Sequence, residues 1–139
     1  MALSSIGLFL LRVGAGGLML WFHGLPKLLE FGEKAATFPD PFGFGSKFSL
    51  GLAVFAEFFC SILVIWGILT RLAAIPLVTT MMTAVFIIHA DDPWTKKEFA
   101  LLYAIPFLAL IFTGPGKISI DHFMFKKTQE PLPQKLPLS

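Results

Sequence analysis

The sequence predicts an all-α integral membrane protein, built as a bundle of four transmembrane helices. Of its 139 residues, 55% are hydrophobic and only 14% are charged, whereas a soluble domain usually carries about 25% charged residues. The mean hydropathy is +0.76. This composition excludes a soluble enzyme. The net charge of +2, with scattered or terminal lysines, gives no electrostatic footprint for nucleic acid.

Four apolar stretches are expected to form the spans. They cover residues 3–25, 48–69, 72–90 and 99–113. At a rise of about 1.5 Å per residue, each of the first three is long enough for a hydrocarbon core of about 30 Å. The fourth is short unless it begins near Lys97, and it contains Pro106, which a membrane helix tolerates when neighbours satisfy the freed carbonyl. Residues 1–121 therefore predict one four-helix transmembrane domain.

The connections between the stretches predict antiparallel neighbours. Thr70 and Arg71 form a minimal turn, and residues 91–97 form a polar link. The first connection, residues 26–47, mixes Phe with Pro and Gly, so we expect an interfacial cap over the bundle. Residues 122–139 are expected to form a polar, disordered tail.

Two further features concern packing and redox chemistry. Small residues recur along the first stretch at Gly7, Gly14, Gly17 and Gly24, which predicts a stripe where helices approach closely in lipid. The single cysteine, Cys60, excludes both an intrachain disulfide and a paired-cysteine redox motif.

Two charges fall well inside the expected spans. Arg12 and Glu57 lie at similar predicted depth, and charges at membrane depth are expensive and face the protein interior. An ion pair between the first two helices is therefore the expected arrangement. Such a pair either fixes helix packing alone or forms part of a proton-responsive or ligand-binding site.

Other polar residues gather near one predicted end of the bundle. His23 and His89 end the first and third stretches, Glu98 opens the fourth, and Lys27 lies one turn beyond His23. This group is the loop-side mouth. Imidazoles and a carboxylate ligate metals or relay protons, and an imidazole N–H donates a hydrogen bond to the carbonyl oxygen of a quinone entering from the lipid. No pair of ligands at helical spacing favours a metal, so we assign no metal ligands.

The order of these residues resembles the DoxX family of small membrane proteins. The resemblance covers residues 6–121 and rests on several segments taken together: Arg12, His23-Gly24-x-x-Lys27-Leu28, Phe31, Glu57, Trp66 to Ala74 with its Thr70-Arg71 turn, His89, Glu98 and Gly114-Pro115-Gly116-x-x-Ser119-x-Asp121. It implies a four-helix membrane bundle. Some members of the family are subunits of a thiosulfate:quinone oxidoreductase. Others are linked to quinone detoxification, or to a membrane complex with superoxide dismutase and a sulfurtransferase.

The resemblance and the polar residues together lead us to expect a membrane protein of a redox or oxidative-stress pathway that binds a quinone, or a similar apolar ligand, at the mouth. The expected ligand-binding residues are Arg12, His23, Lys27, Glu57, His89 and Glu98, and the expected catalytic residues are His23, His89 and Glu57. The sequence leaves catalysis itself open, since it shows at most a quinone-linked oxidoreductase subunit.

Two alternatives stand beside this expectation. In the first, the chain is a membrane anchor or assembly subunit for a soluble oxidoreductase. In the second, it is a transporter of a small solute. The expected partners are the lipid bilayer, a quinone, and a soluble oxidoreductase or further copies of the chain. We expect a multi-pass protein of the inner membrane. Lys and Arg are equally frequent on its two predicted sides, and the distribution of acidic residues favours termini in the cytoplasm.

Overall fold

The computed structural model describes residues 2–126, and this part of the chain contains helices and connections but no strand. The helices, with η marking π-helical turns, are α1 (Ala2–Met19), η1 (Leu20–Gly24), α2 (Leu25–Leu29), α3 (Phe31–Lys34), α4 (Ser46–Val54), η2 (Phe55–Cys60), α5 (Ser61–Trp66), α6 (Thr70–Thr83), η3 (Ala84–Ile88), α7 (Trp94–Thr113) and α8 (Ile120–Lys126). The all-α class predicted from the sequence is confirmed.

Several of these segments run on into one another as longer helices. Leu3–Leu29, Ser46–Trp66 and Thr70–Ile88 are the three helices of the described chain that are long and apolar enough to cross a membrane. The helix α7 is also long, but its first turns carry Lys96, Lys97 and Glu98. It begins at Trp94, five residues before the apolar stretch that predicted it, directly after Pro93, whose backbone is extended (ψ 152°).

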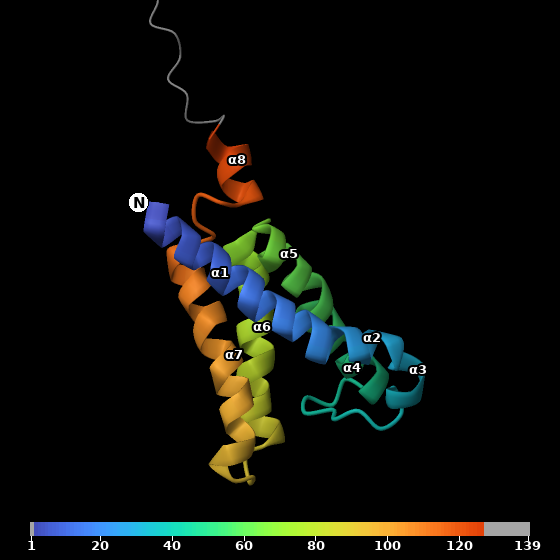
Figure 1. The fold of residues 1–139 in the computed structure, drawn as a ribbon. Helices are drawn as coiled ribbons and strands as arrows, with labels where there is room; N and C mark the ends of the chain where they lie inside the picture. The colour runs from blue at the N-terminus through green and yellow to red at the C-terminus, as the bar shows by residue number, and fades with distance from the viewer. Residues whose placement is uncertain (1, 127–139) are drawn as a thin grey trace, which may run out of the picture.

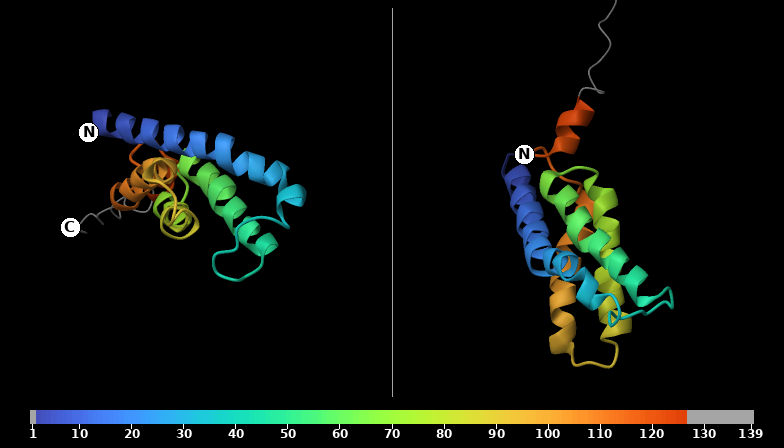
Figure 2. Two further views of the ribbon diagram at one scale, coloured as in Figure 1. Left: turned by 90° about the horizontal axis from the view of Figure 1, so that it is seen from below. Right: turned by 90° about the vertical axis from the view of Figure 1, so that its right-hand side faces the viewer.

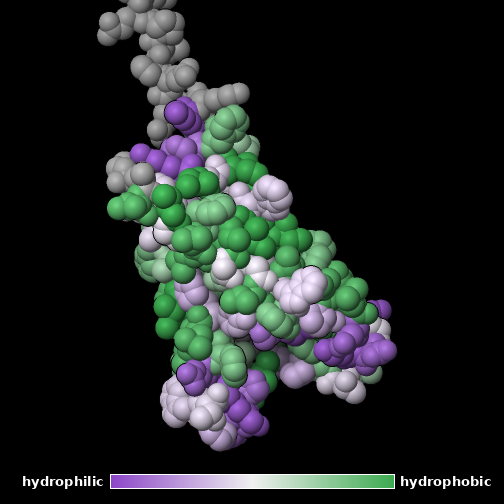
Figure 3. All heavy atoms as spheres, in the orientation of Figure 1, coloured by the Kyte–Doolittle hydropathy of each residue, from purple (hydrophilic) through white to green (hydrophobic). Residues whose placement is uncertain are grey.

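The long helices pack as a bundle (Figure 1). The helices α6 and α7 lie side by side and antiparallel, and α1 packs against α5 and α7. Figure 2 shows the same arrangement from below and from the side. The core between them is apolar and includes Met19, Val64, Leu77 and Phe107. The outer surface is apolar too, and hydrophilic residues gather at the two ends of the molecule (Figure 3), the distribution expected of a bundle embedded in lipid.

Two glycines fix the register of the first helix against the second. A Cβ on Gly24 would lie 2.3 Å from the carbonyl oxygen of Glu57, and one on Gly16 would lie 2.8 Å from the Ile65 side chain. Gly24 faces Glu57 and Gly16 faces Ile65, so a step of eight residues along one helix matches a step of eight residues back along the other. The two helices are therefore antiparallel and keep one register over this length. The predicted stripe is therefore wrong at Gly7, Gly14 and Gly17, where an added Cβ meets nothing within 4 Å.

The two ends of the bundle differ in their connections. The start of α1 and the helix α8 lie at one end, and the first connection and the α6–α7 link lie at the other (Figure 1). At the first end, α5 ends in a tight turn in which Gly67 (φ 71°) and Leu69 (φ 47°) are left-handed. This turn places α5 and α6 antiparallel, as predicted, and α6 already begins at Thr70.

The predicted tail and cap take partly different forms. Residues 122–126 belong to α8 and are helical rather than disordered, while residues 127–139 lie outside the described residues. The first connection contains the short helices α2 and α3 before a loop leads into α4. In that loop the Asp40 carboxylate accepts hydrogen bonds from the amides of Phe44 and Gly45 and from the Ser49 hydroxyl.

Candidate functional site

A buried ion pair joins the first and second helices near the loop end. Lys27 Nζ lies 2.7 Å from Glu57 Oε2, and the side chains are 20% and 4% exposed. Glu57 belongs to η2, and Lys27 follows η1 by one turn. The contact of Gly24 with the Glu57 backbone brings the two π-helical segments together. The site therefore holds two opposite charges that pair where Glu57, if left alone, would be a buried charge without a partner.

His23 completes this group from the same helix as Lys27. Its ring meets the ring of Tyr103 edge-to-face, with centroids 5.1 Å apart and an interplanar angle of 81°. The His23 imidazole is also close enough to the charges of Lys27 and Glu57 to interact with both electrostatically. We call His23, Lys27, Glu57 and Tyr103 the polar site.

The helices are irregular where they supply this site. His23 lies in η1 and Glu57 in η2, and a π-helical turn widens the helix by one residue per turn. Such turns are rare and occur frequently at functional sites. In the sequence neither turn has a signal, because Leu20–Gly24 and Phe55–Cys60 read as ordinary apolar helix.

Tyr103 is the residue of this site that the sequence analysis missed. It comes from α7, is partly buried, and is the only tyrosine in the chain. Its being the one tyrosine of the sequence is the signal that could have drawn attention to it. A lone phenol in an apolar helix has a hydroxyl group to satisfy, which favours a position facing other polar groups.

The predicted ion pair between Arg12 and Glu57 is wrong. Arg12 Nη1 donates hydrogen bonds to the carbonyls of Val64 (3.2 Å) and Ile65 (3.1 Å), and Nη2 donates to the carbonyl of Ile118. The register set by the two glycines is the cause, because it places Glu57 level with Gly24 and Arg12 level with the turn after α5. Arg12 is 1% exposed and lies far from the polar site.

The predicted mouth is likewise divided between two places. His89 Nδ1 lies 2.7 Å from Asp92 Oδ2 in the α6–α7 link, and this hydrogen bond is the main reason why the pKa of Asp92 is lowered. Glu98 is exposed on α7. Of the predicted set, the structure brings together His23, Lys27 and Glu57. Among the described residues, no three His, Cys, Asp or Glu side chains are grouped so that they could hold a metal ion.

Asp121, one of the residues on which the resemblance to the family rests, has a clear role in the structure. Its carboxylate accepts hydrogen bonds from the amides of Leu69 (2.8 Å) and Thr70 (3.0 Å), and its own amide donates to the Gly67 carbonyl (2.8 Å). Because α6 begins at Thr70, Asp121 caps that helix from a distant part of the chain. It also supports Leu69 in its left-handed conformation.

Comparison with known proteins assigns the chain to a family. The sequence model of DoxX matches residues 7–90, a range that contains His23, Lys27 and Glu57. The chain belongs to the DoxX family. This confirms the resemblance described above. No solved structure matches the chain significantly.

Individual relatives are similar over most of their length. Two Haemophilus influenzae proteins, both described as uncharacterized, are 35% and 32% identical to the chain; the first alignment covers 78% of this chain and 84% of the relative, the second 69% and 67%. A Bacillus subtilis protein named "Putative oxidoreductase CatD" is 29% identical over 88% of this chain and 90% of its own length.

Proposed function

We propose that this DoxX-family protein acts in a redox pathway and binds a quinone head group, or a similar apolar ligand with a polar head, at His23, Lys27 and Glu57. The observation that carries the proposal is the Lys27–Glu57 pair, in which Glu57 belongs to η2 and Lys27 to α2, directly after the η1 segment that contains His23. The name of the Bacillus subtilis relative supports the redox assignment.

The chemistry of the three side chains suits a quinone. The ammonium group of Lys27 has three N–H donors, so its contact with Glu57 leaves donors for a carbonyl oxygen of the ligand. Reduction of a quinone adds two electrons and two protons. His23 and Glu57 are groups that hold and transfer protons, whereas the electrons would come from a partner protein or another cofactor. In this proposal His23 and Glu57 are the catalytic residues, Lys27 binds the ligand, and Tyr103 positions the His23 ring.

The remaining predicted site residues have other roles in this proposal. Arg12 contacts backbone carbonyls at the far end of the bundle, and Glu98 faces solvent or headgroups. His89 pairs with Asp92 in a link on the loop side. We propose that this pair passes protons at the surface and does not touch the ligand.

Photolabelling with an azido-benzoquinone tests the proposal. With the purified protein in detergent, we expect labelling of peptides containing His23 or Tyr103 that an unlabelled short-chain quinone competes away. His23→Ala and Glu57→Gln should raise the competitor concentration needed by about tenfold or more, a loss of about 1.4 kcal/mol. His122→Ala, at an exposed position on α8, is the matched control. Equal competition in all four proteins would contradict the proposal.

A purely anchoring role is the second candidate, and the contacts of Arg12 favour it. The hydrogen bonds of its guanidinium hold the fold together, as they would in a subunit that only recruits a soluble oxidoreductase. On that account Arg12→Ala lowers the folded yield, whereas His23 and His89 substitutions leave partner recruitment unchanged. Loss of quinone binding in His23→Ala with a normal folded yield would decide for the quinone site.

We also propose that α7 is a fourth membrane span and that both termini lie in the cytoplasm of an inner-membrane protein. Its packing beside α6 supports this, because α6 is itself one of the spanning helices. Charged residues at Lys96, Lys97 and Glu98 would then lie at the headgroup level, where long side chains reach the interface.

A further inference from the structure

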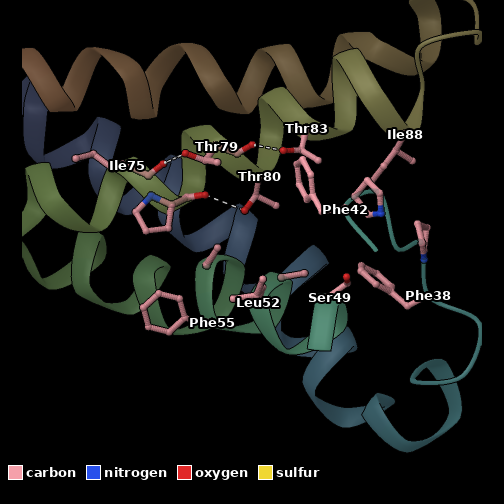
Figure 4. Close-up of a pocket in the computed structure, with 15 residues that line it drawn as sticks. Phe38, Phe42, Ser49, Leu52, Phe55, Ile75, Thr79, Thr80, Thr83 and Ile88 are labelled. Atoms are coloured by element: carbon pink, nitrogen blue, oxygen red, sulfur yellow. Dashed lines mark hydrogen bonds between the residues drawn. The ribbon is translucent and has the colours of Figure 1, made fainter. Parts of the chain in front are cut away.

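An apolar cavity lies between the second and third long helices. Its volume is about 380 Å³, and its walls come from α4–η2, from α6–η3 and from the loop before α4. Figure 4 shows Leu52 and Phe55 on one wall, Thr79 and Thr83 on the other, and Phe38 and Phe42 from the loop at one end. Within the described residues, it shares no lining residue with the polar site.

The hydroxyl groups in the cavity walls already have acceptors. Thr79, Thr80 and Thr83 donate to the carbonyls four residues earlier on their own helix, at 2.9, 2.8 and 2.8 Å (Figure 4). Ser49 donates to Asp40 at 2.9 Å. The hydroxyl groups of the wall therefore already donate their hydrogen atoms within the protein, and a polar head group would find no side-chain donor there. Hydrocarbon is the occupant that such a wall accepts without loss.

The position of the cavity indicates the source of that hydrocarbon. Both walls belong to helices long and apolar enough to span a membrane, so lipid chains surround them. Ligand cavities typically measure about 300–1,000 Å³, so this cavity is large enough for part of a lipid chain. The side chains that shape its floor include Ala53 and Ala56, whose small size leaves the space open.

The loop closes one end of the cavity and is itself fixed in place. The Asp40 carboxylate accepts hydrogen bonds from two loop amides and from Ser49 at the start of α4. The rings of Phe42 and Phe44 lie 6.0 Å apart. The tethered loop places Phe38 and Phe42 at one end of the cavity, and we expect a lipid chain to enter from the bilayer.

We propose that this cavity is a binding site for one acyl chain of a membrane phospholipid, held between α4–η2 and α6–η3 under the Phe38–Phe42 loop. The site is separate from the polar site and does not depend on quinone binding. Its occupant fills the space between two helices that otherwise meet through small side chains and hydroxyl groups.

Photolabelling in vesicles of phosphatidylethanolamine and phosphatidylglycerol tests this site. A small fraction of the phosphatidylethanolamine carries a diazirine within one acyl chain, and peptide mass spectrometry locates the labels. We expect labels on cavity residues such as Thr79 and Thr83 to saturate as the probe fraction rises. Labels on the outer surface of α7, at Leu102 and Ile105, should instead rise in proportion to the probe.

Filling the cavity should remove the saturable labels. In the double variant Ala53→Leu/Ala56→Leu we expect about tenfold less labelling at Thr79 and Thr83. Gly14→Leu is the matched control, because Gly14 is exposed on α1 and a Cβ there meets nothing within 4 Å. If the double variant does not fold, Thr79→Phe fills the cavity from an exposed position and should reduce labelling at Thr83 to the same extent.

Two results would overturn the proposal. Cavity labels that rise in proportion to the probe, as on the surface of α7, would show ordinary lipid contact without a site. Saturable labels that a long-chain isoprenoid quinone displaces, when added phospholipid of the same chain length does not, would assign the cavity to a quinone tail.

Discussion

The guanidinium of Arg12 contacts the last carbonyls of α5 and the carbonyl of Ile118 in the segment that leads to α8. The last turn of a helix leaves its carbonyls without the regular intrahelical partner, and of the carbonyls that Arg12 contacts, that of Val64 also accepts a hydrogen bond from the Gly67 amide (3.1 Å). Arg12 satisfies them from α1 and so ties three parts of the chain together. At this scale the most buried charged side chain of the described core serves the fold.

Arg12→Ala should therefore destabilise the protein. The hydrogen bonds of a charged group contribute about 1.5–3 kcal/mol each to stability at most, and the carbonyls of Val64, Ile65 and Ile118 would lose this donor. We expect a lower midpoint in thermal unfolding and a lower folded yield. Arg12→Lys should recover part of this loss, since one ammonium cannot reproduce the planar fork of the guanidinium. An unchanged midpoint in Arg12→Ala would contradict this role.

Asp40 makes the loop over the cavity sensitive to acid. Its hydrogen bond from the Gly45 amide, with those from Ser49 and Phe44, holds its pKa below the ordinary value of 3.8. Because the folded-state pKa is the lower one, the stabilising contribution is complete above the ordinary value and is lost as the pH falls through the lowered pKa.

Hydrogen exchange at Phe44 and Gly45 should report this change. After correction for intrinsic rates, protection of the two amides should decrease as the pH falls below 3.8. The Asp40→Asn variant, which has no carboxyl group to titrate, should show constant protection over the same range. A wild-type profile as flat as that of the variant would refute the assignment.

At the scale of helices, the position of the polar site depends on the close approach of η1 and η2. Gly24 sits against the Glu57 backbone, so the separation of the two helices is set by a hydrogen atom in place of a methyl group. The same contact sets which residues of the two helices face each other. Lys27 can reach Glu57 for this reason, and Arg12 cannot.

Gly24→Ala should disturb this arrangement. The added methyl would lie 2.3 Å from the Glu57 carbonyl oxygen, and backbone cannot move aside as a flexible side chain does. Overpacking of this kind costs about 1–3 kcal/mol. Gly14→Ala, in the same helix with open space around it, should be neutral or slightly stabilising. Equal unfolding midpoints in the two variants would contradict the packing account.

The sequence predicts the long helices well and the site only in part. Hydropathy locates the helices because each of the first three apolar stretches is long enough for a membrane core. Which residue pairs with Glu57 depends on the register between two helices. The positions of charges along the sequence do not determine that register. The register follows from Gly16 and Gly24, of which the predicted stripe included only the second. Spacing on a regular helix also gives no sign of the two π-helical turns.

At the scale of the whole molecule, the number of spans determines where the termini lie. Three helices of the described chain meet the criteria for a span, and α7 lies antiparallel to the third of them. If α7 crosses the membrane, the first loop and the α6–α7 link lie on one side, with Lys117 on the other. If it does not, the link and Lys117 share a side.

Accessibility of single cysteines distinguishes these arrangements. In a Cys60→Ala background, Lys47→Cys, Thr95→Cys and Lys117→Cys are reacted in intact cells with a maleimide that does not cross membranes. We expect Lys47→Cys and Thr95→Cys to react from outside and Lys117→Cys to react only after lysis. Labelling of Thr95→Cys and Lys117→Cys from the same side would show that α7 does not span.

The polar site is tested most directly by native mass spectrometry of the protein released gently from its own membranes. We predict a bound mass that matches a quinone, retained in His122→Ala and lost in His23→Ala and Glu57→Gln. The cavity variant Ala53→Leu/Ala56→Leu should keep that mass and lose a phospholipid. A quinone mass that survives in His23→Ala and Glu57→Gln, or wild-type protein that carries phospholipid but no quinone, would contradict the proposed function.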